Sequence, residues 1–336
     1  MKKLRIVLPL FLLAVLLFGL AACTGDVFAI YKQAEEKTRS IKTGKQKVCL
    51  TFSNEADMGK LGSILKNGKN RSPEAAILYE TLNKFKDFRI EYTKQYDVMQ
   101  DKYISDGYIR FNIYNLEGKL YKDKDSYIIE KLQTPKYVRF TSHELAEEFF
   151  KQYDFEGQNL SFNNDITAVL ADIADEHITR DSMMSNGRKI LSTLEGDIKV
   201  KELKITLEGE RLKNLKNEFL HALSQNTLVF SELDSDKIAD RRIKEMLTAV
   251  IRPLEPLSME YTVFIDANGY IMEKNINLKS KLYYPEIDME VTKTWNYNSQ
   301  YWDLNKEQDI QPPKGIDAEG TIDVKTFLEL INNISL

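Results

Sequence analysis

One acidic segment with a histidine contains the residue types best suited to metal chemistry. It holds Asp172, Asp175, Glu176, His177 and Asp181. On a helix, residues four apart share a face, so these carboxylate and imidazole groups could surround a cation. The HExxH arrangement of zinc enzymes is absent, however, and such runs of charge are usual on solvated helix faces. We therefore predict a solvent-exposed charged face here and no metal site.

Nucleophilic and cofactor chemistry find no support in the sequence. The chain has three histidines, His143, His177 and His221, and no GxSxG sequence or catalytic-triad order accompanies them. The glycine patterns that bind dinucleotides (GxGxxG) and nucleotide phosphates (GxxxxGK followed by Ser or Thr) are also absent. We therefore predict that the protein is not an enzyme and has no catalytic residue and no cofactor.

Three further residues have a simple structural interpretation. Glu91 and Glu260 occupy matching positions in the similar segments 88–93 and 257–262. Together they could form a polar site, although charges on strands commonly point outward to solvent. Cys49 alternates with the apolar residues of a predicted strand, and we expect it to pack as a small hydrophobic residue.

The first 22 residues have the three-part layout of a secretory signal peptide. A basic start with Lys2, Lys3 and Arg5 precedes the apolar run 6–20, which small residues then follow. The run is shorter than the roughly 20 residues that cross a bilayer. The segment is therefore expected to be a cleaved leader.

The end of this leader, Leu20-Ala21-Ala22-Cys23, resembles the bacterial lipobox. That resemblance implies cleavage before Cys23, attachment of a diacylglycerol to its thiol, and anchoring of the mature chain to a membrane. Two or more acyl chains on that residue anchor a protein stably, whereas a single chain binds a membrane only reversibly. Cys49 would then be the only free thiol, and no intramolecular disulfide would form.

Charge and composition limit the partners. The whole chain has a net charge of −4, and loss of the three basic leader residues leaves −7. A mildly acidic body lacks the basic stripe of a nucleic-acid binder, so no nucleic-acid partner is expected. Sparse glycine with abundant Lys, Asn, Ile and Tyr is typical of an AT-rich Gram-positive genome. We therefore expect an extracytoplasmic location, with the anchor in the outer face of the cytoplasmic membrane.

The apolar periodicity predicts helices and antiparallel strands in alternation. Helical spacing marks 26–41, and Pro73 opens a second helix. From Phe88 the period changes to two, which predicts a meander with a turn at 116–119. A helix is expected over 181–194.

The order helix, strand, helix, meander then recurs. The segments 200–207, 257–262 and 268–271 are similar to 47–52, 88–93 and 106–109. Asn268-Gly269 is a strong hairpin turn, because both positions adopt positive φ readily. We predict an α+β fold with curved antiparallel sheets packed on helices, built by tandem duplication. The units are expected at 23–160 and 161–336, after the leader 1–22.

The lipobox, the first helix leading into a strand, the tyrosine-rich meander and the tail ending Ile310-Gln311-Pro312-Pro313 together resemble lipoproteins of the LolA, LolB and LppX type. Their half-barrel sheet curls around helices, and the resemblance implies a lipid or other apolar ligand in its concave face. A curved sheet must fill that side with side chains, helices or ligand. Two interpretations stay open for the residues that we place there: they line a ligand cavity, or they pack on the helices as a dry core. The residues are Ile90, Tyr92, Ile109, Phe111, Ile113, Met259, Tyr261, Val263 and Ile265.

Two functional hypotheses follow. The first is a membrane-anchored envelope lipoprotein that binds a lipid or apolar small molecule. The second is a structural or regulatory envelope lipoprotein that binds a protein partner through its surface. A ligand binder should co-purify with lipid and have a void lined by these sheet residues, whereas an interaction protein should have a filled core and an exposed apolar patch.

Overall fold

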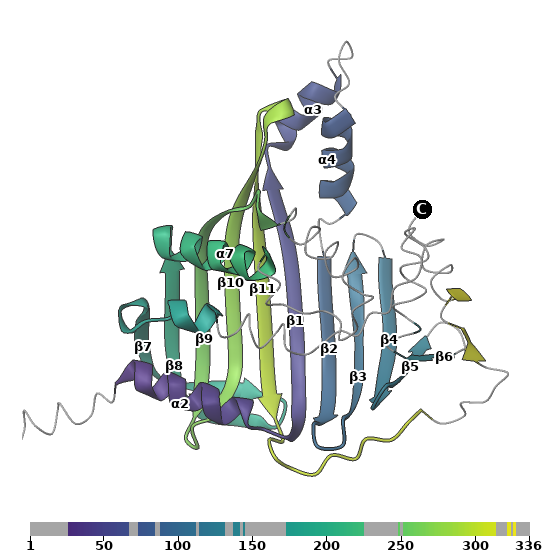
Figure 1. The fold of residues 1–336 in the computed structure, drawn as a ribbon, viewed down its shortest axis with the longest axis vertical. Coiled ribbons are helices and arrows are strands. Elements are labelled where there is room, and N and C mark those ends of the chain that lie inside the picture. The colour runs from purple at the N-terminus through teal and green to yellow at the C-terminus, as the bar shows by residue number, and fades with distance from the viewer. Residues whose placement is uncertain are drawn as a thin grey trace, which may run out of the picture.

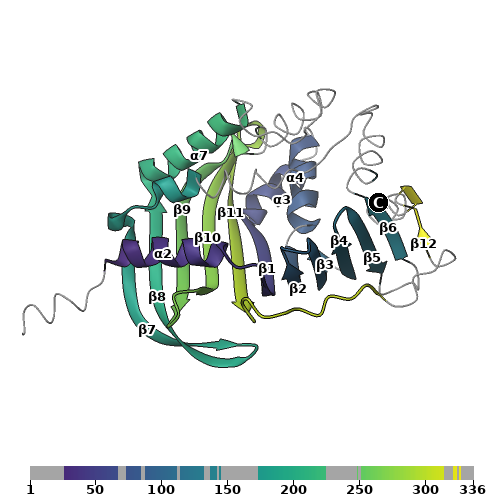
Figure 2. The same ribbon diagram turned by 60° about the horizontal axis from the view of Figure 1, so that its bottom comes forward.

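The protein forms one curved, unclosed sheet of 12 strands with helices on one face (Figures 1 and 2). The computed structural model describes residues 26–66, 73–84, 88–111, 114–131, 137–141, 144, 173–224, 248, 251–313, 321–323 and 325–326. The predicted α+β class with a curved sheet packed on helices is confirmed. Among the described residues, no helix is long and apolar enough to cross a membrane.

The chain enters the sheet at its centre. The first half contains α2 (Val27–Arg39), β1 (Thr43–Ala56), α3 (Met58–Lys66), α4 (Pro73–Lys84), β2 (Phe88–Asp97), β3 (Lys102–Phe111), β4 (Tyr114–Asp123), β5 (Ser126–Lys131) and β6 (Tyr137–Thr141). The second contains η1 (Arg180–Ser182), β7 (Met183–Thr193), β8 (Gly196–Glu208), α7 (Gly209–Ser224), β9 (Glu255–Asp266), β10 (Ile271–Tyr284), η3 (Pro285–Ile287), β11 (Met289–Trp302) and β12 (Thr321–Ile322).

Apart from β12, the strands of the second half lie side by side on one side of β1, and the remaining strands of the first half lie on the other. The order across the sheet is β7-β8-β9-β10-β11-β1-β2-β3-β4-β5-β6-β12. All neighbours are antiparallel except β12 and β6. In both halves a long strand is followed by helices and then by a meander that starts beside that strand. The halves meet where β1 pairs with β11, for example at Leu50 and Tyr297. The tandem duplication and its boundary near residue 160, which lies outside the described residues, stay predictions.

Two local predictions were wrong. Residues 183–193, expected to be helical, form β7 and pair with β8, with a register shift between Ser185 and Gly187. Residues 116–119, expected to be a turn, lie inside β4, where Gly118 is opposite Gly107. In both cases pairing with a neighbouring strand outweighs the local preference, as is common for strands.

Helix α2 is held on the sheet by a packed core. The Asp26 side chain accepts a hydrogen bond from the Phe28 backbone N–H at 3.1 Å, and Lys37 and Arg39 occupy the last turn, where cations are favourable. Its inner face buries Tyr31 and Ala34. The core beneath contains Leu203, Ile205, Tyr261, Val263, Ile265 and Ile271, and α7 covers β8 and β9 nearby (Figure 1).

A second core lies at the far end of the long strands. Leu61 of α3 and Leu78 of α4 pack on Ile287, Met289 and Val291. These two helices connect the antiparallel neighbours β1 and β2, so the core fixes the position of that connection (Figure 1).

Candidate binding face of the sheet

The helix-facing side of the sheet has continuous apolar rows that cross both halves. The strand registers place one residue from each strand side by side in the central row. From β8 to β3 this row is Ile205, Tyr261, Ile276, Tyr297, Leu50, Ile90 and Ile109. Neighbours in such a row touch, because side chains opposite each other on adjacent strands are about 5 Å apart. The row is therefore one surface although it comes from seven strands.

The burial of this row changes along its length. At the β8 end Ile205 is fully buried, and Tyr261 is 6% exposed against α2. At the other end Leu50 and Ile90 are half-buried, and Ile109 is 40% exposed. The same apolar surface is therefore packed by helices in one half and left partly open in the other, among the residues described.

The predicted ligand residues divide along this boundary. Tyr261, Val263 and Ile265 belong to the packed core under α2, and Met259 packs against its edge. Ile90, Tyr92 and Ile109 lie on the partly open half, where the backbone of Phe111 continues the same face. Ile113 and the Phe111 side chain lie outside what the structure describes, as do Leu20, Ala21, Ala22 and Cys23. We call Leu50, Ile90, Tyr92 and Ile109 the open face.

An aromatic row flanks the open face on the side nearer α3. Phe52 and Trp295 are cross-strand partners with ring centroids 4.2 Å apart, and Phe88 lies opposite Phe52 on β2. All three are half-buried. Close, tilted aromatic pairs stabilise a surface beyond the area that they bury.

Tyrosines and a lysine flank the open face at the opposite end. Tyr96 and Tyr103 are cross-strand partners, and the Lys94 ammonium lies 4.2 Å from the Tyr103 ring centroid. Burial raises the pKa of both tyrosines to about 12. Burial also lowers the pKa of Lys94, with a contribution from the nearby Lys122. Sequence reasoning missed Lys94, although its position between Tyr92 and Tyr96 in the period-two pattern places it on this face.

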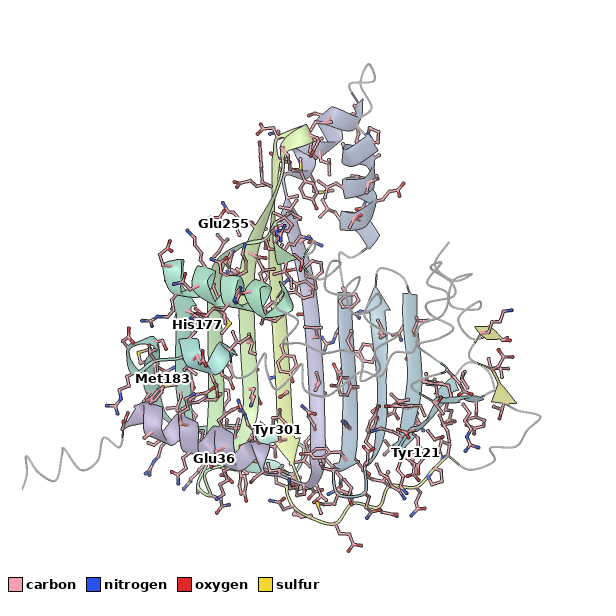
Figure 3. All side chains as sticks on the ribbon, viewed as in Figure 1. Glu36, Tyr121, His177, Met183, Glu255 and Tyr301 are labelled. Carbon is pink, nitrogen blue, oxygen red and sulfur yellow. The ribbon has the colours of Figure 1, made fainter. Side chains whose placement is uncertain are left out.

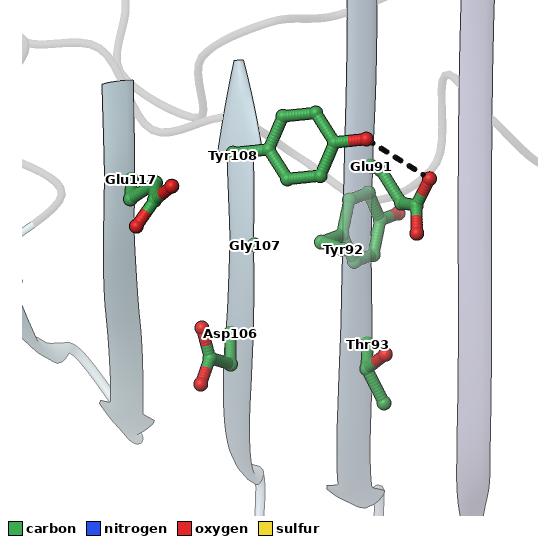
Figure 4. Close-up of a pocket in the computed structure, with 7 residues that line it drawn as sticks. All are labelled: Glu91, Tyr92, Thr93, Asp106, Gly107, Tyr108 and Glu117. Carbon is green, nitrogen blue, oxygen red and sulfur yellow. Dashed lines mark hydrogen bonds between the residues drawn. The ribbon is translucent and has the colours of Figure 1, made fainter. Parts of the chain in front are cut away.

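The opposite side of the sheet is largely polar and holds a pocket of about 600 Å³ beside Asp97, Tyr121 and Ile310, together with two smaller pockets. One, of about 290 Å³, is lined by Glu91, Tyr92, Thr93, Asp106, Gly107, Tyr108 and Glu117 (Figure 4). The other, of about 320 Å³, has paired asparagines on β10 and β11: Asn275 bonds Asn298, and Asn277 bonds Asn296. Cys49 is half-buried and lines this second pocket, on the face of β1 opposite that of Leu50.

Glu91 is held by a local network. Its carboxylate lies 2.9 Å from the Lys47 ammonium and contacts the Arg89 guanidinium. It also accepts a hydrogen bond from the Tyr108 hydroxyl at 3.2 Å (Figure 4). Lys47 and Arg89 lower the pKa of Glu91 to about 2. Glu260 pairs instead with Lys204 at 3.0 Å, and four strand spacings of roughly 5 Å separate it from Glu91. The two glutamates therefore do not form one site.

The acidic segment is structural where it is described. Asp175 is 18% exposed and clamps α2, accepting a hydrogen bond from Tyr31 at 3.2 Å and pairing with Arg39 at 3.0 Å. His177 lies 2.9 Å from Glu218 of α7, beside which it is labelled in Figure 3. The expected solvent-exposed face is therefore wrong for Asp175, which is half-buried and joins its own segment to α2. No group of potential metal ligands occurs among the described residues, which exclude Asp172 and His143.

Comparisons with known proteins add little to this geometry. No family model matches the chain, and no curated protein matches it. One similar solved structure is an uncharacterized conserved protein from Thermus thermophilus, with 5% identity and a TM-score of 0.24. That alignment covers 88% of this chain and 97% of the other.

Proposed function

We propose that the protein is a membrane-anchored envelope lipoprotein that binds a lipid or another apolar molecule on the open face. The observation that carries the proposal is the change in burial along one apolar row. Ile205 is fully buried, whereas Ile109 in the same row is 40% exposed. Burying apolar surface stabilises by about 25 cal/mol per Å², so an extended apolar row is a favourable place for an apolar ligand.

The two ends of the row have different roles in this proposal. The end under α2 has its helix already packed on it and acts as the rigid support. The open face then offers side chains whose positions the sheet fixes before a ligand arrives. A preformed apolar surface of this kind binds with a smaller loss of conformational freedom than a flexible one.

The anchor follows from the lipobox and is part of the same proposal. The described chain starts at Asp26, three residues after Cys23. The Asp26 carboxylate also pairs with Arg180 at 2.5 Å, which fixes the start of α2. A lipid on Cys23 would hold the domain close to a bilayer, where apolar ligands are available.

A protein partner is the second candidate, and one observation favours it. Strand β7 is at the edge of the sheet, where it pairs only with β8 (Figure 2). It leaves Met184 57% and Ile190 68% exposed. Edge strands with exposed apolar side chains are natural places for strand addition by another chain.

A neutral fluorescent probe distinguishes the two candidates. The chain from residue 24 onward keeps every described element, and N-phenyl-1-naphthylamine should bind it with increased fluorescence. The matched variants are Ile109→Glu and Arg110→Glu, which change neighbouring exposed residues on opposite faces. We expect Ile109→Glu to weaken probe binding about tenfold or more, because a charge must be desolvated. Arg110→Glu should bind like the parent. No probe binding by the parent, or equal loss in both variants, would contradict the proposal.

A further inference from the structure

Lys94 is a half-buried cation on the helix-facing side of the sheet. On β2 it follows Ile90 and Tyr92 at the strand period, so it shares their face. Its ammonium lies 4.2 Å from the Tyr103 ring centroid and 5.8 Å from that of Tyr96. For a cation, such aromatic contacts are weaker than pairing with a carboxylate.

The neighbouring lysines differ from Lys94 in this respect. Lys45 pairs with Asp303 at 2.8 Å, and Lys122 pairs with Asp101 at 2.5 Å. Within the described part of the chain, Lys94 has no carboxylate at ion-pair distance. Burial lowers its pKa and Lys122 lowers it further, while the more distant Asp101 carboxylate opposes this without forming an ion pair with Lys94. A half-buried charge of this kind is stabilised by an anion that brings its own charge.

The distance from Lys94 to the aromatic row is long enough to hold one lipid tail. Phe88 and Lys94 are six residues apart on β2, which is about 20 Å at the rise of an extended strand. One leaflet of a bilayer has a hydrocarbon depth of about 15 Å, half of the full core. Ile90 and Tyr92 fill the interval on β2, and Leu50 lies opposite Ile90 on β1. An extended acyl chain with its head at Lys94 would therefore lie along apolar side chains.

We infer that the ligand of the open face is a long-chain fatty acid anion whose carboxylate pairs with Lys94. This inference rests on the proposed function and specifies its ligand. A single ammonium balances a single negative charge. The ammonium lies against the Tyr103 ring, so a small planar carboxylate can approach it more closely than a bulky phosphodiester. Lys94 holds the carboxylate headgroup in place, while the apolar rows supply the surface against which the acyl chain is buried.

Displacement of the bound neutral probe tests this assignment. Oleate should displace N-phenyl-1-naphthylamine at lower concentration than oleyl alcohol, which has the same tail without the charge. In Lys94→Gln the affinity for oleate should fall about tenfold to a hundredfold, the range of a charge-assisted hydrogen bond, and the affinity for oleyl alcohol should not change. Lys94→Arg should keep most of the oleate affinity.

Lys293 provides the matched control. It is also a half-buried lysine whose pKa burial lowers, and its ammonium lies 5.7 Å from the Phe52 ring centroid, at the other end of the apolar rows. We expect Lys293→Gln to bind oleate like the parent.

Each other outcome has a definite meaning. Failure of the probe to bind the parent removes the proposed function and this inference together. Probe binding with equal affinity for oleate and oleyl alcohol overturns only this inference. An oleate affinity that depends on Lys293 but not on Lys94 also overturns it. Tighter displacement by phosphatidylglycerol than by oleate, with the same dependence on Lys94, overturns the assignment to a fatty acid.

Discussion

At the scale of single residues, close packing and charge organise the two faces of the sheet. Gly107 is needed because β2 and β3 approach closely. A Cβ at this position would lie 2.3 Å from the Glu91 carbonyl oxygen and 2.5 Å from the Tyr92 Cβ. Gly118, its partner on β4, has more room, with 3.3 Å to the Glu130 carbonyl oxygen.

This difference predicts unequal effects of the same substitution. Gly107→Ala should lower the free energy of unfolding by about 1–3 kcal/mol, the usual cost of overpacking. Gly118→Ala should cost clearly less, because the clash is milder. Urea denaturation of both variants measures the difference, and equal stabilities would contradict the close approach of β2 to β3.

Glu91 predicts a pH dependence of stability. Its pKa in the folded state is about 2, below the 4.5 of an unperturbed glutamate, because Lys47 and Arg89 favour the charged form. A lowered pKa means that the stabilisation is complete above pH 4.5 and is lost as the pH falls toward 2. The parent should therefore be more stable than Glu91→Gln at pH 7, by about 1 kcal/mol for such a partly exposed network. The gap should shrink between pH 4.5 and pH 2; a gap that stays constant over this range would contradict the assignment.

At the scale of elements, α2 is attached to the sheet by polar as well as apolar contacts. The Lys274 ammonium of β10 lies 2.9 Å and 3.1 Å from the two carboxylate oxygens of Glu35, and the Glu35 side chain is 10% exposed. The Thr38 hydroxyl also accepts a hydrogen bond from the Ile271 backbone N–H at 2.9 Å. These contacts fix the helix that follows the proposed anchor.

Removing one partner of the Lys274–Glu35 ion pair should lower the free energy of unfolding substantially. Lys274→Met leaves the enclosed Glu35 carboxylate without this partner, and we expect a loss of about 3 kcal/mol in the free energy of unfolding. The double variant with Glu35→Leu as well should recover most of that loss, because no charge of the pair then stays buried. Chemical denaturation of the two variants checks this; a double variant as unstable as the single one would show that the ion pair itself is required.

The elements also show what sequence alone could predict. The hairpin between β9 and β10 was predicted from Asn268-Gly269, and Gly269 does adopt a φ of 82°, whereas Asn268 does not adopt the positive φ that was also expected. Helix α4 begins at Pro73 as expected. Strand β7 was missed because its structure depends on pairing with β8, which the local residue types do not encode. The same non-local pairing of β1 with β11 brings Leu50 beside Tyr297, so only the β2 and β3 members of the open face could be predicted.

At the scale of the whole molecule, the sheet joins two arrays of strands into one apolar surface. Helices α2 and α7 cover the β8 to β10 part of it (Figure 2). The proposed anchor precedes α2, so the covered half and the anchor belong to the same end of the sheet. The open face lies on β1, β2 and β3.

The anchor makes a prediction of its own. Cys23→Ala removes the thiol that would carry the lipid, so the protein should leave the membrane fraction or accumulate with its leader attached. Fractionation of cells with detection of the chain measures this, and Cys49→Ala is the matched control that leaves the anchor intact. Unchanged membrane attachment of Cys23→Ala would contradict the lipoprotein assignment.

The most direct test of ligand binding is native mass spectrometry of the chain from residue 24 onward, before and after solvent extraction. We predict an added mass in the range of a single lipid, lost on extraction, restored by added oleate and reduced in Ile109→Glu. A bare polypeptide mass in both samples, with no uptake of added oleate, would contradict ligand binding on the open face and favour the protein-binding surface at β7.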